Sequence, residues 1–422
     1  MKKKYAIIVD PYSSGSLLAP EFVRRGFDCV AVHSQPLRIP DNGGRPNGSF
    51  FFAEQYLGAQ GVEALGAELL RLGQPVAVVA GTESGVILSD QLSEYLNLPG
   101  NDRMSSLARR DKFLMHEAVK MSGLASVDQC VVRTTSEALK WLGMTGHDQV
   151  VSKPRSSAGS DNVRLCRSPG ELEASVDTIL RSMNYVGEKN HDALLQEYIP
   201  GTEYVVDTIS SNGRHLTINL CCYTKSIVNG AFLYRETRFL PPTGELAEKL
   251  IRYNDAVLDV LGIVTGPAHS EIILSGEGSP ILVEVGARLH GGVTGPQVVR
   301  RCSSLDPFDV LVDAYVDNDG FRAAANEGNR FIRHATAYCF ANQTEGIVTG
   351  FPSRNRLMCL ASFFDFKANV SVGDKISKTV DLYSSPGWIV LCHHDAKQLA
   401  SDLEEVKRLE AEGSIVGVLR EP

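Results

Sequence analysis

The sequence predicts an α/β fold at the N-terminus, followed by an α+β region built from many short strands. Near the N-terminus, strand-like runs alternate with amphipathic helix-like segments: strands at 5–9, 28–32 and 75–81, helices at 17–25 and 86–96. Alternation of this kind is typical of a small parallel sheet that is covered by helices on both faces. Further along, short strand-like runs follow one another, and two apolar runs between His269 and Val285 have the period-2 pattern of a hairpin.

Composition restricts the class of protein. The chain has 422 residues, of which 43% are hydrophobic and 22% charged, as in an ordinary globular protein with two or three domains. A formal net charge of -8 and the lack of a long basic run argue against partners such as nucleic acid or an anionic membrane. No window approaches the length of a transmembrane span. Nine cysteines without a CxxC pair indicate reduced thiols, so we expect a cytoplasmic protein.

Loop-type residues divide the chain into three expected domains. The segment 97–102 (NLPGND) has turn composition and marks a first boundary, which gives domains at 1–100, 101–205 and 206–422, the last with a β-rich tail from about 320. We expect helices at 105–122, 246–262 and 396–412, each from its apolar spacing. The first strand-to-helix turn, 10–16, is rich in Gly and Ser but lacks GxGxxG, so it indicates an ordinary tight turn.

Two glutamates in the expected hairpin suggest a cation site. If Glu277-Gly278 is a two-residue turn, Glu271 and Glu284 lie opposite each other with Cβ atoms roughly 5 Å apart. Opposed carboxylates repel unless a cation lies between them, and oxygen ligands favour a hard ion such as Mg²⁺. A three-residue loop would shift the register by one residue and send the carboxylates to opposite faces. The alternative is a solvent-facing hairpin edge with two unrelated glutamates.

Two lysines upstream are candidate phosphate ligands. Lys112 opens the helix after the first boundary, and Lys153 ends a strand just before the loop residues Ser156, Ser157 and Gly159. A Gly/Ser loop leaves backbone N–H groups free to approach phosphate oxygens, and a lysine beside it adds a point charge. Taken singly, each lysine is better explained as an exposed surface residue, and the loop as a plain hairpin turn.

A strand end further on has the character of a nucleotide hinge. The residues Glu197, Tyr198 and Ile199 precede Pro200-Gly201, which ends the strand and exposes backbone groups that can bind a purine edge. Glu203 can accept hydrogen bonds from ribose hydroxyls. The simpler interpretation is a β-turn followed by an exposed glutamate.

A basic and glycine-rich segment follows the second glutamate of the hairpin. Arg288 can bind a phosphate or carboxylate with two parallel hydrogen bonds. Gly291 and Gly292 permit close approach of the backbone to a ligand.

In this order the features resemble the ATP-grasp superfamily: a lysine on a helix, a lysine before a lid loop, an E-Y-I hinge and two glutamates on neighbouring strands. The resemblance covers roughly 107–316, and it implies a Rossmann-like N-terminal domain, a central lid and a mixed β-rich C-terminal domain. It implies that Lys112 and Lys153, with the lid loop, bind the phosphates of ATP, while Glu197 to Ile199 hold adenine and Glu203 holds ribose. Glu271 and Glu284 would bind Mg²⁺, with two ions expected and Mn²⁺ as a substitute.

Further motifs narrow the resemblance to the L-amino acid ligases, the dipeptide synthetases of bacilysin-, tabtoxin- and rhizocticin-type peptide pathways. These motifs are HxE at 269–271, Lys225 after Tyr-Thr, Glu236 after Arg235, and GARLHGG at 286–292. The resemblance implies that Arg288 and Gly291 bind substrate and phosphate, and that Lys225 and Glu236 line the amino-acid pocket. One departure is Gly286, where many members have asparagine, so the second metal would be held differently, for example by Glu284 in bidentate fashion.

The implied reaction is ATP-dependent joining of two L-amino acids. A substrate carboxylate attacks the γ-phosphorus, and an amine then displaces phosphate from the resulting acyl phosphate. Glu236 is one candidate to take the proton of the amine. We expect small amino-acid substrates, no nucleic acid, no membrane, and a homodimer as in related families.

Three alternatives stay open from the sequence. The first is an ATP-grasp ligase for another carboxylate and amine. The second is a biotin-carboxylase-like enzyme, although this chain has no Met-Lys-Met attachment motif for biotin. The third is a catalytically silent module that binds ATP, against which the retention of both lysines, both glutamates and Arg288 argues.

Overall fold

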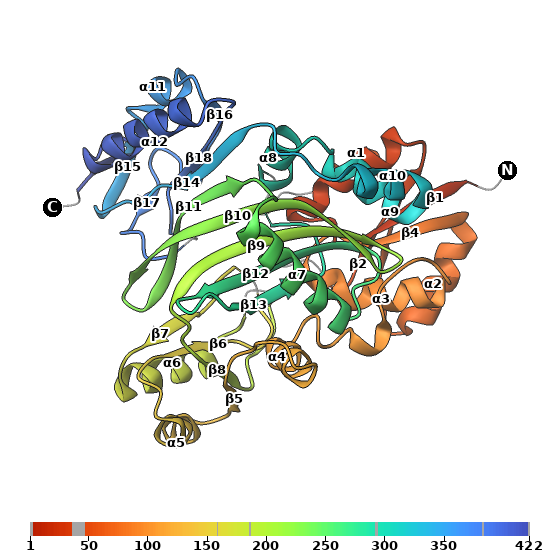
Figure 1. Cartoon of the computed structure of the whole chain (residues 1–422), viewed down its shortest axis with the longest axis horizontal. Coiled ribbons are helices and arrows are strands. Elements are labelled where there is room, and N and C mark those ends of the chain that lie inside the picture. Colours follow the sequence, from red (N-terminus) through yellow and green to blue (C-terminus); the bar gives the residue numbers. More distant parts are fainter. Residues whose placement is uncertain are drawn as a thin grey trace. The chain divides into compact units, whose positions relative to one another are not determined.

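The computed structural model describes residues 3–35, 47–157, 159–184, 187–291, 294–381 and 384–420. Contacts divide the chain into two compact units, each made from three separate segments. Unit 1 comprises 1–127, 204–220 and 241–330; unit 2 comprises 128–203, 221–240 and 331–422. Two long strands, β9 (Gly201–Ser211) and β10 (Arg214–Val228), contribute residues to both units (Figure 1). The three continuous domains expected from the sequence stay a prediction.

Unit 1 begins with the expected parallel sheet. Its strand order is β3-β2-β1-β4, and every neighbouring pair is parallel. The strands are β1 (Lys4–Val9), β2 (Asp28–His33), β3 (Ala53–Tyr56) and β4 (Gln74–Ala80). The helices are α1 (Leu18–Arg24), α2 (Gly61–Leu72) and α3 (Val86–Tyr95). Both faces of β1 are buried, since Tyr5 packs in the core beneath α2 and α3 and Ala6 packs in the core that includes α1.

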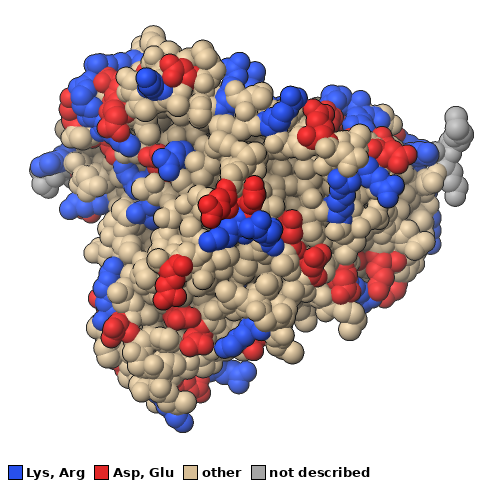
Figure 2. Space-filling model, in the orientation of Figure 1, with Lys and Arg blue, Asp and Glu red and all other residues tan. Residues whose placement is uncertain are grey.

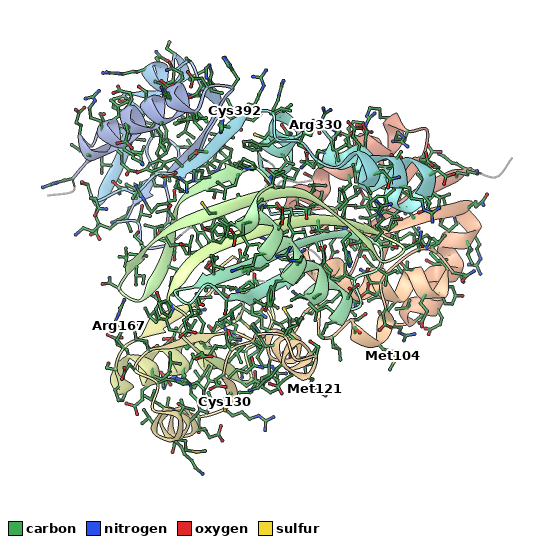
Figure 3. All side chains as sticks on the ribbon, viewed as in Figure 1. Met104, Met121, Cys130, Arg167, Arg330 and Cys392 are labelled. Atoms are coloured by element: carbon green, nitrogen blue, oxygen red, sulfur yellow. The ribbon has the colours of Figure 1, made fainter. Side chains whose placement is uncertain are left out.

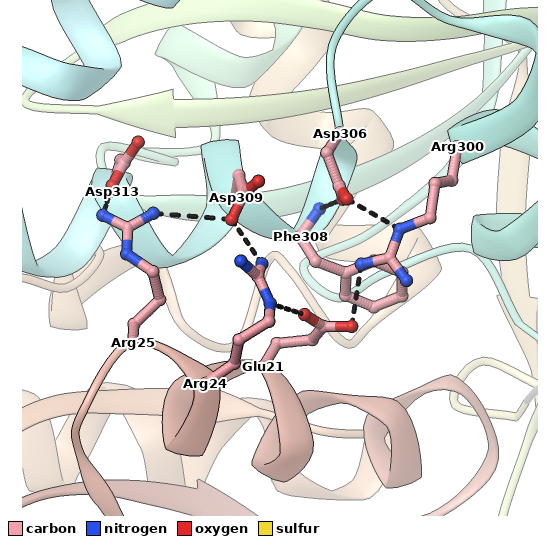
Figure 4. Close-up of polar contacts among 8 residues, drawn as sticks. All are labelled: Glu21, Arg24, Arg25, Arg300, Asp306, Phe308, Asp309 and Asp313. Carbon is pink, nitrogen blue, oxygen red and sulfur yellow. Dashed lines mark hydrogen bonds and ion pairs between the residues drawn. The ribbon is translucent and has the colours of Figure 1, made fainter.

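Ion pairs join α1 to two later helices of unit 1, α8 (Thr294–Cys302) and α9 (Pro307–Val316), as Figure 4 shows. Glu21 of α1 accepts a hydrogen bond from Arg300 of α8 at 2.7 Å, and Arg24 pairs with Asp309 of α9. Arg300 also reaches Asp306, the N-terminal cap of α9, at 2.7 Å. This network fixes α8, whose N-terminus follows the segment that contains Arg288.

The remaining part of unit 1 contains strands in the order β13-β12-β9-β10, of which β12 and β13 pair antiparallel. Its further elements are α4 (Lys112–Met121), α7 (Glu245–Val260), β12 (Gly266–Ser275), β13 (Pro280–Gly286) and α10 (Asn318–Glu327). The expected helix at 105–122 begins instead at Lys112, because the side chain of Asp111 caps the N–H groups of Phe113 and Leu114. One face of α4 is buried, whereas Met121 points outward (Figure 3) and is 86% exposed.

Unit 2 contains two separate cores. In the first, α5 (Thr135–Thr145) and α6 (Pro169–Arg181) pack on a four-stranded region. Its strands are β5 (Gln129–Val132), β6 (Val150–Lys153), β7 (Arg164–Cys166) and β8 (Ala193–Glu197). All pair antiparallel, in the order β7-β6-β8-β5. The sequence analysis expected a lid within 101–205, and that assignment stays a prediction.

The second core of unit 2 lies under α12 (Ala396–Ala411), whose Leu399, Leu403 and Val406 are buried as the apolar spacing predicts. Its strands pair in the order β11-β14-β18-β16. They are β11 (Ala231–Leu240), β14 (His334–Cys339), β16 (Phe363–Ala368) and β18 (Gly387–His393). A small sheet with α11 (Arg354–Met358) completes the unit: β15 (Gly346–Gly350), β17 (Lys375–Ile376) and β19 (Gly417–Leu419).

The distribution of surface charge and the state of the cysteines agree with what the composition predicts. On the face drawn in Figure 2, acidic and basic side chains of the described residues are interspersed. All nine cysteines are free thiols, and five of them are buried. Within the part of the chain that the structure describes, none of the helices has both the length and the apolar content that crossing a bilayer requires.

Candidate active site

The hairpin of β12 and β13 places Glu271 directly opposite Glu284, as predicted, but by a different route. The turn is not a two-residue turn at Glu277-Gly278. Ser275 N–H bonds to Ser279 O at 3.0 Å, which encloses a three-residue loop, with Gly278 at a positive φ of 79°. The predicted turn is therefore wrong.

A β-bulge compensates for the longer loop. Ile272 pairs with Leu282, but the next residue, Glu271, pairs with Glu284, so Val283 is an extra residue without a partner on β12. The loop shifts the register by one position and the bulge shifts it back. Both carboxylates consequently project from the same face of the hairpin.

Helix α4 supports the bulge and carries the first predicted lysine. The carbonyl of Val283 lies 3.1 Å from Nε2 of His116, and the N–H of Val285 donates to the sulfur of Met115 at 3.3 Å. Lys112 lies on the same helical face, three and four residues earlier. Its Nζ is 2.9 Å from Oε2 of Glu284. The structure thus brings Lys112 and Glu284 into direct contact.

The pair of glutamates fits a hard cation. Glu271 and Glu284 offer carboxylate oxygens from adjacent strands, and both side chains are only partly buried. Lys112 neutralises one of the two charges, which leaves a carboxylate surplus at the pair. Oxygen donors with an excess of negative charge are the set that Mg²⁺ prefers in proteins.

Arg288 follows the hairpin and is held by a glutamate that the sequence analysis did not identify. Its Nε lies 3.1 Å from Oε2 of Glu83, in the turn after β4, and Arg110 reaches the other oxygen of Glu83 at 2.8 Å. Burial alone would raise the pKa of Glu83, but Arg110 and Arg288 outweigh it and hold the pKa below its usual value. The carboxylate is therefore ionised and fixes the guanidinium of Arg288.

The same ion pair explains why Gly286 stands where an asparagine was expected. A Cβ at position 286 would lie 2.9 Å from Oε2 of Glu83 and 3.0 Å from Cζ of Arg288. A side chain at that position would therefore require the Glu83 carboxylate or the Arg288 guanidinium to shift. The space that an asparagine would need is thus filled by the Glu83–Arg288 pair.

Substituting alanine for Gly286 should accordingly displace Arg288. If Arg288 has the role that the sequence resemblance implies, kcat/KM of the implied reaction should fall roughly 10- to 100-fold, because misplacing a catalytic group by about 1 Å has effects of this size. Gly276→Ala in the hairpin loop is the matched control, since a Cβ there meets nothing within 4 Å. Steady-state kinetics of both variants would test this, and equal rates for the two would contradict the role assigned to the pair.

A buried cluster of one carboxylate and two imidazoles borders Glu271. Nδ1 of His269 lies 2.6 Å from Oδ1 of Asp207, and Nδ1 of His290 lies 3.2 Å from Oδ2. Nε2 of His269 is 3.6 Å from Oε1 of Glu271. Sequence analysis placed His269 and His290 within motifs but gave them no role, and it missed Asp207. Asp207 could have been identified only from the pairing of β9 with β12, which the sequence alone did not give.

In unit 2, Lys153 lies at the end of β6 and is buried. Among the described residues of the loop behind it, Ser157 Oγ donates to Asp161 at 2.8 Å and Asn184 holds the carbonyl of Ser156 at 2.6 Å. Gly159 has a positive φ of 70° and marks the tip of the loop. Ala158 of this loop, like Gly292 after Gly291, lies outside the described residues.

The predicted hinge follows β8 in unit 2. Backbone N–H groups of Glu197 and Tyr198 bond to Asp128 O and Gln149 O, at 3.0 and 3.2 Å. The next N–H, that of Ile199, donates to none of the residues that the structure describes. A backbone donor is therefore available at the position expected to meet a purine edge.

Glu203 and Lys225, predicted separately, form one ion pair in unit 2. Nζ of Lys225 lies 2.6 Å from Oε1 of Glu203 and 2.7 Å from the hydroxyl of Tyr234. Glu236 of β11 lies elsewhere in the unit and pairs with Lys407 of α12 at 3.5 Å. Lys407 therefore places a positive charge beside Glu236 within unit 2.

The predicted site residues therefore form several local groups. In unit 1, Lys112, Glu271, Glu284 and Arg288 lie on or beside the hairpin, and Gly291 is an exposed residue of the following loop. The residues of unit 2 are Lys153, Ser156, Ser157, Gly159, Glu197, Tyr198, Ile199, Glu203, Lys225 and Glu236. Glu83, Arg110, Asp207 and His290 join the first group from positions that the sequence alone did not connect.

Comparison with known proteins identifies related chains. Residues 147–297 match the ATP-grasp domain. The chain is 29% identical over 435 aligned positions to dapdiamide A synthase of Enterobacter agglomerans, with 99% of both chains covered. It is 22% identical over 263 positions to the L-arginine-specific L-amino acid ligase of Bacillus subtilis, covering 61% of this chain and 62% of that one.

Among solved structures, an L-amino acid ligase from Bacillus licheniformis superposes with a TM-score of 0.77. The match covers 100% of this chain and 99% of the other at 18% sequence identity, so it establishes a shared fold. The predicted fold class and the predicted resemblance are confirmed.

Proposed function

On the premise that this chain is an ATP-grasp protein homologous to L-amino acid ligases, we propose that it joins two L-amino acids into a dipeptide. In the proposed reaction ATP activates one carboxylate as an acyl phosphate, and ADP and phosphate are released. The observation that carries the proposal is the opposed pair Glu271 and Glu284, with Lys112 in contact with one carboxylate. Arg288 follows the same hairpin within unit 1 and is held by an ion pair.

The residues of the hairpin suit the phosphate end of the reaction. Glu271 and Glu284 would hold Mg²⁺, which supplies charge neutralisation on the triphosphate when bound. Lys112 adds a positive charge at Glu284. Arg288, with its donors aligned by Glu83, would bind the transferring phosphoryl group and the oxyanion of the tetrahedral intermediate.

The residues of unit 2 suit the nucleotide and the amino-acid substrates. The N–H of Ile199, which donates to none of the described residues, supports adenine binding at the hinge of Glu197, Tyr198 and Ile199. Lys153 and the loop at Ser156, Ser157 and Gly159 would contact the phosphates and exclude water from the acyl phosphate. In this assignment Glu203 contacts ribose, while Lys225 and Glu236 contact the amino acids.

The test is phosphate release from Mg-ATP across a matrix of paired L-amino acids, with mass spectrometry of the products. We expect release that requires two amino acids and yields a dipeptide mass. Release with one amino acid and a different amine would point to an ATP-grasp ligase for another substrate pair. Tight ATP binding without release in any pair would contradict the ligase and favour the silent ATP-binding module.

Finer parts of the proposal rest on the same family resemblance. We propose two Mg²⁺ ions, replaceable by Mn²⁺, which a metal titration of activity would count. The nine free thiols support a reducing, cytoplasmic location. A homodimer is proposed as well, and the molar mass in solution from light scattering would decide it.

A further inference from the structure

The imidazole of His290 lies at the edge of the buried cluster that borders Glu271. Asp207 of β9 is the centre of that cluster and accepts hydrogen bonds from three directions: from His269 of β12, from His290, and from Asn219 of β10 at 2.7 Å. The two imidazole rings lie 4.2 Å apart between centroids. A carboxylate that accepts three hydrogen bonds is held in one orientation, and it also fixes the orientation of each of the three donors.

The hydrogen bond to Asp207 sets the tautomer of His290. Its Nδ1 faces the carboxylate and carries the proton, so the lone pair lies on Nε2. Among the described residues Asp207 is the hydrogen-bond partner of this ring, and the side chain keeps 19% of its surface exposed. An acceptor nitrogen is therefore presented toward solvent, two residues after Arg288.

The surroundings of the His290 ring act on its pKa. Burial lowers the pKa of His290, and the positive charges of His269 and Arg288 lower it further. Asp207 opposes these effects by raising the pKa. At neutral pH the imidazole of His290 is therefore neutral.

This pattern is that of a proton acceptor. A neutral imidazole oriented by an ionised carboxylate can take a proton at Nε2, and the carboxylate then stabilises the imidazolium. The groups that face His290 are Asp207, His269 and Arg288, while Gly295 of α8 packs beside its ring. The proposed reaction needs such an acceptor, because the amino group of an amino acid is an ammonium ion in neutral solution. In that form its nitrogen has no lone pair and cannot act as a nucleophile.

We propose that His290 is the general base of the second half-reaction, held by Asp207, and that it accepts the proton of the attacking amine at Nε2. This role deepens the proposed ligase function and rests on it. One proton of the ammonium group passes to Nε2, and the lone pair that this frees on the nitrogen forms the bond to the acyl carbon. The bond between the acyl carbon and the phosphate oxygen then breaks, and its electron pair leaves with phosphate, which takes the second proton from the nitrogen and departs as HPO4²⁻. His290 returns its proton to solvent.

Hydroxylamine separates the two half-reactions. It is largely unprotonated at neutral pH and attacks an acyl phosphate without a base, giving a hydroxamate that can be measured with one amino acid and ATP. His290→Asn retains an amide donor toward Asp207 but removes the acceptor at Nε2. We expect this variant to lose dipeptide formation by roughly 10²-fold or more, while its hydroxamate formation stays close to that of the unchanged enzyme.

Two further variants define the outcome. Asp207→Asn should lower dipeptide formation in the same selective way, and the exposed His394→Asn should change neither product. An equal loss of hydroxamate and dipeptide in His290→Asn, or full dipeptide formation, would overturn the base role. If the unchanged enzyme forms hydroxamate, the proposed activation step stands in either case; if it forms none, the proposed function fails and the role falls with it.

The pH dependence gives an independent readout. Because the pKa of His290 lies below its usual value, the base is present at neutral pH and is lost as the pH falls through that pKa. Dipeptide formation by the unchanged enzyme should therefore decline on the acid side, whereas hydroxamate formation should not follow the same limb. In His290→Asn the acid limb of dipeptide formation should flatten, and an unchanged limb would contradict the proposal.

Discussion

Replacing Glu284 with glutamine is expected to abolish ATP-dependent turnover while the protein stays folded. The change removes one of two carboxylates that face each other across the hairpin and also breaks the ion pair with Lys112. A metal ion stabilises transition-state charge by several kcal/mol, so its loss corresponds to roughly 10²- to 10⁴-fold in kcat. Thermal stability should change little, because the substitution also removes repulsion between like charges.

The matched control is Glu277→Gln. It removes the same charge from the loop of the same hairpin, where the side chain is exposed. Phosphate release at saturating Mg-ATP would be measured for both variants, together with their melting temperatures. A Glu284→Gln enzyme with the unchanged rate would refute the metal assignment. If the melting temperature of this variant fell strongly, its loss of activity would be explained by unfolding and not by the loss of a metal ligand.

The largest effect on stability is expected from Arg109→Met in unit 1. Arg109 is fully buried, pairs with Asp90 at 2.6 Å and donates to the carbonyls of Leu261 and Asp102 at 2.7 and 2.6 Å. Removing one partner of a buried ion pair costs about 3–5 kcal/mol, because the other charge stays buried and unpaired. At about 2–4 °C per kcal/mol, the melting temperature should fall by roughly 6–20 °C.

An exposed ion pair from the same region provides the comparison. Arg103 pairs with Glu94, and both side chains are more than half exposed, so Arg103→Met should cost less than about 1 kcal/mol. The double change Asp90→Leu with Arg109→Met should recover part of the lost stability, since the unpaired carboxylate is then gone. Differential scanning calorimetry would compare these proteins, and equal losses for Arg103→Met and Arg109→Met would contradict the expectation.

The sequence predicted those parts of the fold whose pattern is local. Strands such as Tyr5–Val9, buried on both faces, and the apolar stripe of α12 appear where the periodicity places them. The short strand β3, of sequence AEQY, was missed because it has four residues, two of them exposed and none buried, and so shows no apolar run. The start of α4 was placed too early, because the cap at Asp111 and not the apolar spacing sets it.

The site was predictable as a set of residues but not as a set of contacts. The order of lysines, hinge and glutamates identified the ATP-grasp resemblance without any geometry. Glu83, Asp207 and His290 come from distant segments and meet only through the packing of β4, β9 and the segment after β13. No local pattern encodes such a meeting, so these residues could be found only in three dimensions.

The opposition of the two glutamates was predicted from a turn that the structure does not contain. The correct pairing arises because a longer loop and an extra residue in β13 cancel. The extra residue is stabilised by His116 of α4, a contact 167 positions away in the chain. A bulge that depends on a distant helix cannot be deduced from the hairpin sequence.

That cancellation makes the hairpin behave like a reading frame. Deleting one residue from the loop 276–278 alone, or Val283 alone, would leave Glu271 and Glu284 on opposite faces, as a single-base deletion leaves a gene out of frame. Deleting one residue at each place would restore the phase. Natural variants of this hairpin should therefore gain or lose length in pairs, and an alignment that treats the two gaps as independent would misplace the glutamates.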